Sequence, residues 1–176
     1  MLTTEDRVKV FGEVMKPYVT PDFTAWLYDN GFFTAPASTK YHGNYGGGLF
    51  DHSFCVTNVL VDLSAKNKLN WKRQDSPFII GMFHDLCKID QYVKTEGEVP
   101  YGFNTNTLLK GHGDKSIMLL SAHLQLTEEE VACIRYHMGA FTEKEEWNDY
   151  TRAIHNYNNV LWVHHADMIA SHIIGT

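Results

Sequence analysis

The segment SPFIIGMFHDLCKID, residues 76–90, combines an almost continuous apolar run with one adjacent pair of ionisable residues, His84 and Asp85. Its Ser-Pro start and its apolar run predict a buried helix that carries the pair. An ionised carboxylate that is buried without a partner costs several kcal/mol, so the charge of Asp85 needs compensation. A divalent cation would supply it. The alternative is a buried hydrogen bond between His84 and Asp85 without a metal.

Two further ionisable residues lie in apolar surroundings elsewhere in the chain. His52 is in a helix predicted over residues 49–66, and Asp167 is in the run VHHADMIASHI of a helix predicted from 158 to 174. Both side chains are expected to point inward. Ligands carried by separate helices commonly converge in the core of a helical bundle. We therefore expect His52, His84, Asp85 and Asp167 to meet around one divalent cation.

His112 and His137 extend this set. His112 begins a predicted helix in GHGDKS, and His137 ends one in IRYHMG, so both can project from helix ends into the same cavity. They would supply the extra ligands that a second cation needs, with Asp85 as the bridging carboxylate. The remaining histidines are not expected to bind metal; they are His42, His123, His155, His164, His165 and His172.

The signals for secondary structure predict an all-α fold. Helices are expected over about 4–15, 21–30, 49–66 and 76–86, from about 111, over 127–137, and from 158 to 174. The stretch 31–48 is rich in Gly, Tyr and Asn and should be irregular, and residues 91–103 should form a small hairpin that turns at Glu96–Gly97. No linker or repeat divides the chain, so residues 1–176 are expected to form a single domain.

Composition narrows the possible partners. The 15 basic and 21 acidic residues give a net charge of −6, which is the wrong sign for holding long nucleic acid. Three cysteines without a CxxC pair suit a reducing compartment, and no apolar run is long enough to span a bilayer. We expect a cytoplasmic protein that acts away from membranes on a small ligand, and a homo-oligomer is left open.

The ordered set His, His-Asp, His, His, Asp resembles the signature of the HD-domain metal-dependent phosphohydrolase superfamily. The segments YHGNYGGGLFDHS (41–53), GMFHDLCKID, GHGDKS, YHMG and HHADMIAS resemble the HD domain of bacterial 3′-5′ exoribonucleases, over about residues 36–174. Two departures stand out. Cys87 occupies a position where that family usually has glycine, and the OB-fold that precedes the domain in those exonucleases is not found in this sequence.

The resemblance implies an HD-type helical bundle and a division of roles. His52, His84, Asp85 and Asp167 would hold the first cation, and Asp85, His112 and His137 the second; Mn, Fe, Co, Ni, Zn or Mg would suit these ligands. Asp85 and Lys88 would be the catalytic residues, and Lys88 would contact the substrate phosphate. The alternative for Lys88 is a solvated cation at a helix end. The expected substrate-binding residues are Lys88, His42, Tyr45 and Lys115.

The favoured function is hydrolysis of a phosphoester or phosphoanhydride, in a nucleotide or similar small substrate, by metal-activated water. A 3′-5′ exonuclease acting on short single-stranded RNA or DNA is the alternative within enzymes. A non-catalytic sensor that holds a phosphate ligand is the alternative of another class. A plain helical bundle whose histidines are core polar residues would bind no metal.

Overall fold

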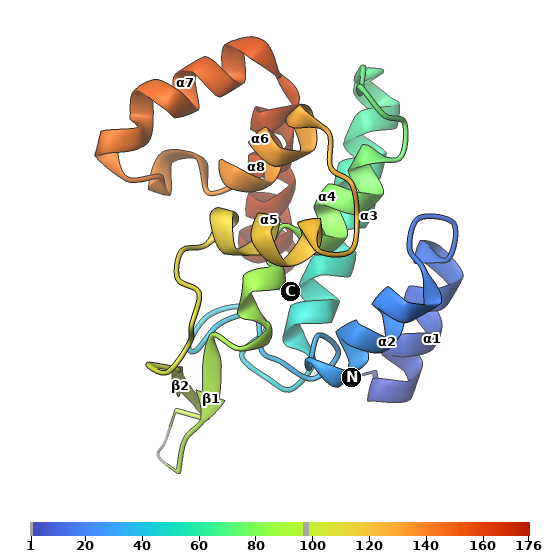
Figure 1. Ribbon diagram of the computed structural model, residues 1–176, viewed down its shortest axis with the longest axis vertical. Coiled ribbons are helices and arrows are strands. Elements are labelled where there is room, and N and C mark those ends of the chain that lie inside the picture. Colours follow the sequence, from blue (N-terminus) through green and yellow to red (C-terminus); the bar gives the residue numbers. More distant parts are fainter. Residues whose placement is uncertain (1, 97–98) are drawn as a thin grey trace.

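Eight α-helices and a two-stranded hairpin make up the described part of the chain, residues 2–96 and 99–176 of a computed structural model (Figure 1). The α-helices are α1 (Thr4–Met15), α2 (Pro21–Asp29), α3 (Gly48–Asn67), α4 (Ser76–Phe83), α5 (Gly113–Ser121), α6 (Glu128–Arg135), α7 (Trp147–Asn156) and α8 (Asn159–Met168). Short 3₁₀ helices are η1 (Leu86–Ile89), η2 (Gly139–Phe141) and η3 (Lys144–Glu146), and the π-helical segment η4 (Ile169–Ile174) continues α8. The predicted all-α class is confirmed.

The hairpin projects from one end of the bundle (Figure 1). Strands β1 (Tyr92–Lys94) and β2 (Tyr101–Phe103) are antiparallel, with Val93 opposite Gly102. The small hairpin-like insertion expected over residues 91–103 is therefore present. Of the expected turn at Glu96–Gly97, Gly97 lies outside the described residues.

Side-chain caps fix the starts of three helices where the sequence predicted them. Thr3 and Asp6 form a reciprocal capping box at α1, and the Thr20 hydroxyl accepts from the backbone N–H of α2. Thr127 and Glu130 form a second capping box at α6, with bonds of 3.2 and 2.8 Å. These caps satisfy backbone N–H groups that a helix start leaves free.

Helix α3 is the central element of the bundle and packs against α4, α8 and η4. The close approach to α4 depends on Gly81, because a Cβ atom there would lie 2.6 Å from the Cα of Thr57. Next to this contact lies a cluster of buried aromatic rings: Phe11, Phe32, Phe33, Phe50 and Phe83. The packing brings His52 of α3 beside the end of α4.

The structure corrects the prediction of one long helix over residues 76–86. Helix α4 ends at Phe83, His84 is its C-cap, and Asp85 has φ −103° and ψ 18° between α4 and η1. No Gly or Pro occurs between His84 and Asp90 to mark this end in the sequence. Helix α6 likewise ends at Arg135, so His137 lies in the turn that follows it. Both changes place site residues on turns at helix ends.

A buried ion pair joins α1 to the first turn of α3. The guanidinium of Arg7, which is 3% exposed, donates from Nε and a terminal nitrogen to the two carboxylate oxygens of Asp51, each at 2.8 Å. The hydroxyl of Tyr45 also donates to Asp51, at 3.0 Å. Gly47 has φ +89°, and a Cβ there would lie 2.3 Å from the guanidinium carbon. The glycine before α3 thus leaves room for this ion pair.

Replacing Arg7 with methionine should leave the partly buried carboxylate of Asp51 without its charged partner. We expect the free energy of unfolding to fall by about 3 kcal/mol, as for other buried pairs that lose one partner. Urea denaturation followed by circular dichroism would measure it. Lys66→Met is the control, because it breaks an exposed ion pair with Asp62 in the same helix, and it should cost less than about 1 kcal/mol. Equal losses in the two variants would contradict the role of Arg7.

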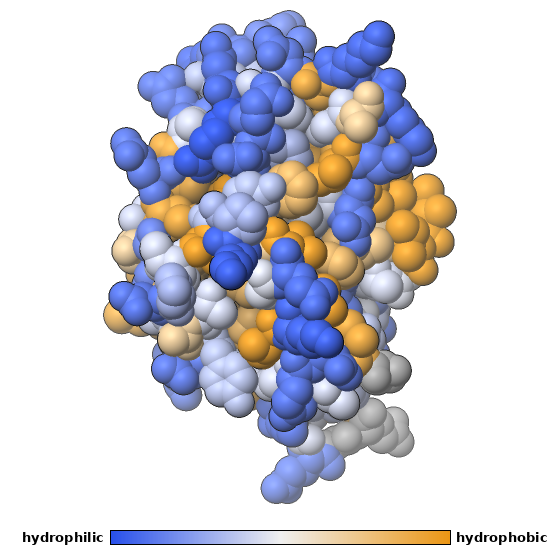
Figure 2. Space-filling model, turned by 90° about the vertical axis from the view of Figure 1, so that its right-hand side faces the viewer, coloured by the Kyte–Doolittle hydropathy of each residue, from blue (hydrophilic) through white to orange (hydrophobic). Residues whose placement is uncertain are grey.

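The surface mixes hydrophilic residues with separate hydrophobic patches on the face shown in Figure 2. Scattered apolar groups of this kind are usual on water-facing surfaces. Among the described residues, no helix has the length and apolar character needed to cross a membrane.

Candidate metal centre

The six predicted ligands come together at one point. They come from α3 (His52), the α4–η1 junction (His84 and Asp85), the N-cap of α5 (His112), the turn after α6 (His137) and α8 (Asp167). Their ligand atoms form three overlapping groups, and within each group the atoms lie within 4.8 Å of one another. The groups are His52–His84–Asp85, His84–His137–Asp167 and Asp85–His112–His137. Asp85, present in two of them, is the central carboxylate.

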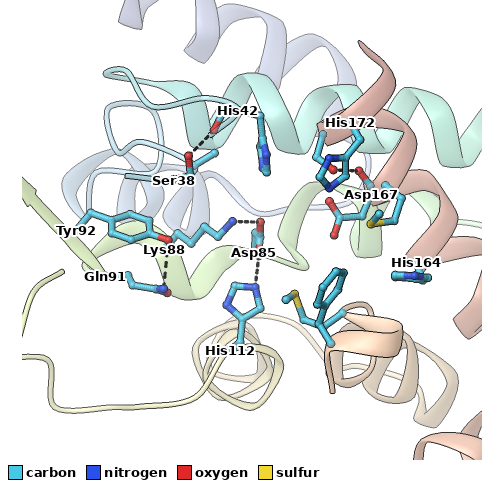
Figure 3. A pocket seen from close by; sticks show the side chains of 15 residues that line it. Ser38, His42, Asp85, Lys88, Gln91, Tyr92, His112, His164, Asp167 and His172 are labelled. Atoms are coloured by element: carbon cyan, nitrogen blue, oxygen red, sulfur yellow. Dashed lines mark hydrogen bonds and ion pairs between the residues drawn. The ribbon is translucent and has the colours of Figure 1, made fainter. Parts of the chain in front are cut away.

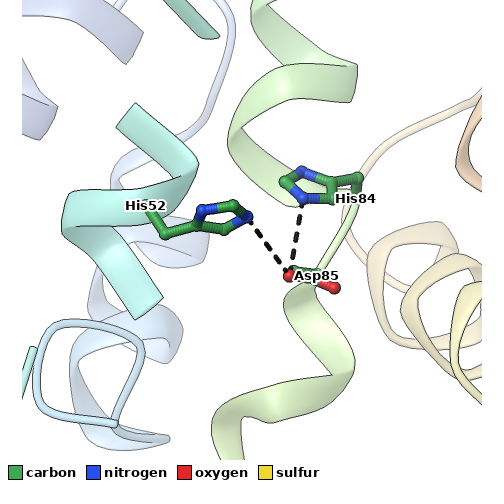
Figure 4. A group of neighbouring side chains, drawn as sticks. All are labelled: His52, His84 and Asp85. Carbon is green, nitrogen blue, oxygen red and sulfur yellow. Dashed lines mark ion pairs between the residues drawn. The ribbon is translucent and has the colours of Figure 1, made fainter. Parts of the chain in front are cut away.

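Short distances surround the Asp85 carboxylate. Nε2 of His52 lies 3.6 Å from Oδ2, and Nε2 of His84 lies 3.5 Å from the same oxygen (Figure 4). On the other side, Nε2 of His112 and His137 lie 2.8 and 3.5 Å from Oδ1. His52 Nε2 is also 3.2 Å from Oδ1 of Asp167. The two oxygens of Asp85 thus face different pairs of imidazoles.

Several of these atoms are buried without a hydrogen bond. Within the described residues, Nε2 of His52, His84 and His137 and Oδ1 of Asp85 have no hydrogen-bond partner, and His112 approaches that oxygen outside hydrogen-bond geometry. The three histidines are 0% exposed and Asp85 is 2% exposed. Most buried polar atoms in folded proteins are paired, so four unpaired ones that face one point need an explanation. Cations held by these groups would satisfy all of them.

Hydrogen bonds on the far side of the rings fix their orientation. Nδ1 of His52, His84 and His137 contacts the backbone carbonyls of Thr176, Gly81 and Ile134 at 2.8, 2.9 and 2.7 Å. A carbonyl oxygen only accepts, so in each ring Nδ1 carries the hydrogen. In the neutral imidazole the lone pair is then on Nε2, directed toward the centre. Metal-binding histidines are commonly oriented in this way.

The charges around Asp85 keep it ionised. Burial alone would raise its pKa, but Lys88 and the neighbouring imidazoles hold the pKa well below its ordinary value. The Lys88 ammonium lies 2.7 Å from Oδ2 (Figure 3), and although burial opposes it, the charge of Asp85 raises the pKa of Lys88. Lys88 is 8% exposed, which rules out the alternative of a solvated helix-end cation. Asp85 is therefore available as an anionic ligand.

A cavity of about 310 Å³ opens beside Asp85, and its size lies at the lower end of the range for small-molecule sites. Polar side chains, most of them labelled in Figure 3, line it together with the apolar residues Met138, Phe141 and Met168. The polar lining includes Lys88, His42, Tyr92, His112, His164 and His172. One cavity therefore brings together three of the candidate metal ligands, Asp85, His112 and Asp167, with the Lys88 ammonium and apolar side chains.

Of the other three expected substrate-binding residues, one lines the cavity and two do not. His42 lines the cavity, with its ring centroid 4.8 Å from that of His52, and burial lowers its pKa to about 4. Tyr45 instead lies in the ion pair beside α1, where it donates to Asp51. Lys115 is 3% exposed, and its ammonium pairs with Asp90. Neither side chain is brought to this cavity.

Two histidines in the cavity lining, His164 and His172, had no expected role. Nδ1 of His164 contacts the carbonyl oxygen of His137 at 2.8 Å, and its ring packs so closely on Gly139 that a Cβ there would lie 2.5 Å away. His164 precedes Asp167 by three residues, a spacing that could have indicated that the two share a helix face. His172 follows Asp167 by five residues, a spacing that shares a face only in a π-helix such as η4.

Comparison with known proteins gives no relative. No protein-family model, curated protein or solved structure matches the chain. The buried His/Asp groups have the donor types and the spacing to hold a metal ion. Any function assigned to the site depends on this geometry and on the sequence pattern.

Proposed function

We propose that this chain is an HD-type, metal-dependent phosphohydrolase that cleaves a phosphoester or phosphoanhydride in a nucleotide or similar small phosphorylated substrate. One observation carries the proposal: four buried ligand atoms without hydrogen-bond partners among the described residues converge around Asp85, which also lines a small cavity. Imidazole nitrogen and carboxylate oxygen suit divalent Mn, Fe, Co, Ni and Zn. The order of the ligands along the sequence supports the same assignment.

The proposed roles follow from the placement of each side chain. His52, His84, Asp85 and Asp167 hold one cation, and Asp85, His112 and His137 hold a second. Bound cations would lower the pKa of water and neutralise phosphoryl oxygens. The Lys88 ammonium lies 2.7 Å from Oδ2 of Asp85. Its positive charge would stabilise the negative charge that grows on the phosphoryl group during hydrolysis. Met138 and Phe141 line the same cavity and offer apolar contact to a substrate.

The preference for a small substrate depends on size and charge. The cavity of about 310 Å³ accommodates a ligand of mononucleotide size rather than a long strand. The chain carries a net charge of −6, and long nucleic acid is normally held by a basic surface. Tyr92 and Phe141 offer aromatic faces on which a base could stack.

Elemental analysis of protein purified without added metal tests the first half of the proposal, and we expect one or two equivalents of a divalent metal. Hydrolysis would then be measured on nucleoside mono- and triphosphates, cyclic dinucleotides and short single strands, each with Mn, Co, Ni or Mg. We expect turnover of a mononucleotide. Turnover confined to oligomers would indicate the exonuclease instead, and tight binding of a nucleotide without turnover would indicate a sensor. A chain that binds no metal would overturn the proposal.

A further inference from the structure

One imidazole of the candidate metal centre is held differently from the others. Nδ1 of His112 lies 3.2 Å from the Sγ atom of Cys87. The corresponding atoms of His52, His84 and His137 contact backbone carbonyls. His112 is also more exposed, with 26% of its side chain accessible against 0% for the other three. The orientation of this ligand therefore depends on a thiol.

Cys87 is itself held firmly in place. It is 0% exposed in η1, and its backbone N–H donates to the hydroxyl of Ser116, at 3.0 Å. Ser116 is also 0% exposed and lies in α5, the helix that His112 caps. A buried thiol at a fixed position thus faces the imidazole.

A thiol can bond to either form of the neutral ring. It can donate S–H to Nδ1, which leaves N–H on Nε2, directed at Oδ1 of Asp85 only 2.8 Å away. It can also accept weakly from Nδ1–H, which leaves the Nε2 lone pair free for a cation. A backbone carbonyl allows only the second arrangement. His112 can therefore direct either an N–H or a lone pair toward Asp85, whereas the other three rings are set as ligands.

We propose that Cys87 is the positioning residue for His112 and that, because a thiol holds this ring less firmly than a backbone carbonyl holds the others, the Asp85–His112–His137 set is the weaker of two cation sites. This inference rests on the proposed metal-dependent function. Sulfur is a weaker acceptor than a carbonyl oxygen, so His112 is held less firmly in its ligand form than His52 or His84. To bind the second cation, His112 must also have the Nε2 lone pair, and not an N–H, directed toward Asp85. The first cation binds without this rearrangement.

Binding of Mn²⁺ to the metal-free full chain tests the proposal. Equilibrium dialysis would give the dissociation constant of each step, and electron paramagnetic resonance would detect spin coupling between two bound ions. We expect two steps in the unaltered protein. Cys87→Ala removes the partner of Nδ1 and should weaken the second step about tenfold, as loss of an outer contact to a metal-binding histidine commonly does. The first step should be unchanged.

Two variants separate positioning from packing. Cys87→Ser keeps a hydroxyl that donates and accepts, so it should restore the second step to within about threefold of the unaltered protein. Cys133→Ala removes another thiol that is 0% exposed, from α6, and should leave both steps unchanged. Second-step binding in Cys87→Ala as tight as in the unaltered protein would overturn the role of Cys87. Absence of any Mn²⁺ binding by the unaltered protein would instead overturn the proposed function.

Discussion

Replacement of Asp85 with asparagine is expected to abolish binding of the second cation, weaken the first and lower hydrolysis by roughly 1000-fold, since a loss of about 4 kcal/mol of transition-state stabilisation has this effect. Asparagine keeps the shape of the side chain but removes the charge that faces four imidazoles. A bound metal contributes several kcal/mol to such a reaction. Metal content and initial rates at saturating Mn²⁺ would measure both effects.

This substitution has a second consequence, because it leaves the Lys88 ammonium, which is 8% exposed, without its negatively charged partner. Loss of one partner from a buried pair costs about 3–5 kcal/mol. The double variant Asp85→Asn/Lys88→Met removes both charges and should recover part of the lost stability without recovering cation binding. Asp62→Asn, at an exposed position in α3, should change neither property. Full activity of a folded Asp85→Asn protein would mean that the site is misassigned.

The site residues could be identified from sequence because their chemistry conflicts with their surroundings. An aspartate in the run FIIGMFHDLC, and another in VHHADMIAS, have to be neutralised if those segments are buried. The sequence could not indicate how each ring is oriented. The partners of Nδ1 in His52, His84 and His137 are backbone carbonyls, which every residue carries, so no residue type marks them.

Proximity in sequence to a candidate metal ligand was a poor guide to which side chains line the cavity. Lys115 follows His112 by three residues, yet its ammonium pairs with Asp90. Tyr45 lies in the glycine-rich segment before α3, and its hydroxyl is directed toward Asp51. In both cases a carboxylate supplied by another segment decides where the side chain points. Such partners become visible only when the fold brings the segments together.

The helix that was not predicted, α7, shows the limit of periodicity. Its sequence WNDYTRAIHN is mostly polar, and within it only Ala153 is classed as buried among the described residues. It lies at the edge of the bundle beside α8 (Figure 1). Helices such as α1 and α6 were predicted because a threonine cap marks each start. Helix α7 has no side-chain hydrogen bond at its N-cap, so that signal is missing.

Removal of bound cations should lower the thermal stability of the protein. The folded chain without metal keeps several buried ligand atoms unpaired among the described residues, whereas the unfolded chain exposes them to water. A cation at 100 times its dissociation constant stabilises the folded state by about 2.7 kcal/mol. For a chain of this length, that corresponds to a rise of roughly 5–10 °C in melting temperature. Scanning calorimetry of chelator-treated protein, with and without added Mn²⁺, would measure the shift.

Substitution of individual metal ligands would show which site causes the shift in melting temperature. Cations that bind weakly to exposed carboxylates would stabilise every variant equally, whereas cations at the proposed centre should stabilise only chains that keep Asp85. We therefore expect Asp85→Asn to show little or no shift and Asp62→Asn to show the full one. Cys87→Ala should keep most of it, because the stronger first site remains intact. Equal shifts in the unaltered protein and Asp85→Asn would place the stabilising cation elsewhere.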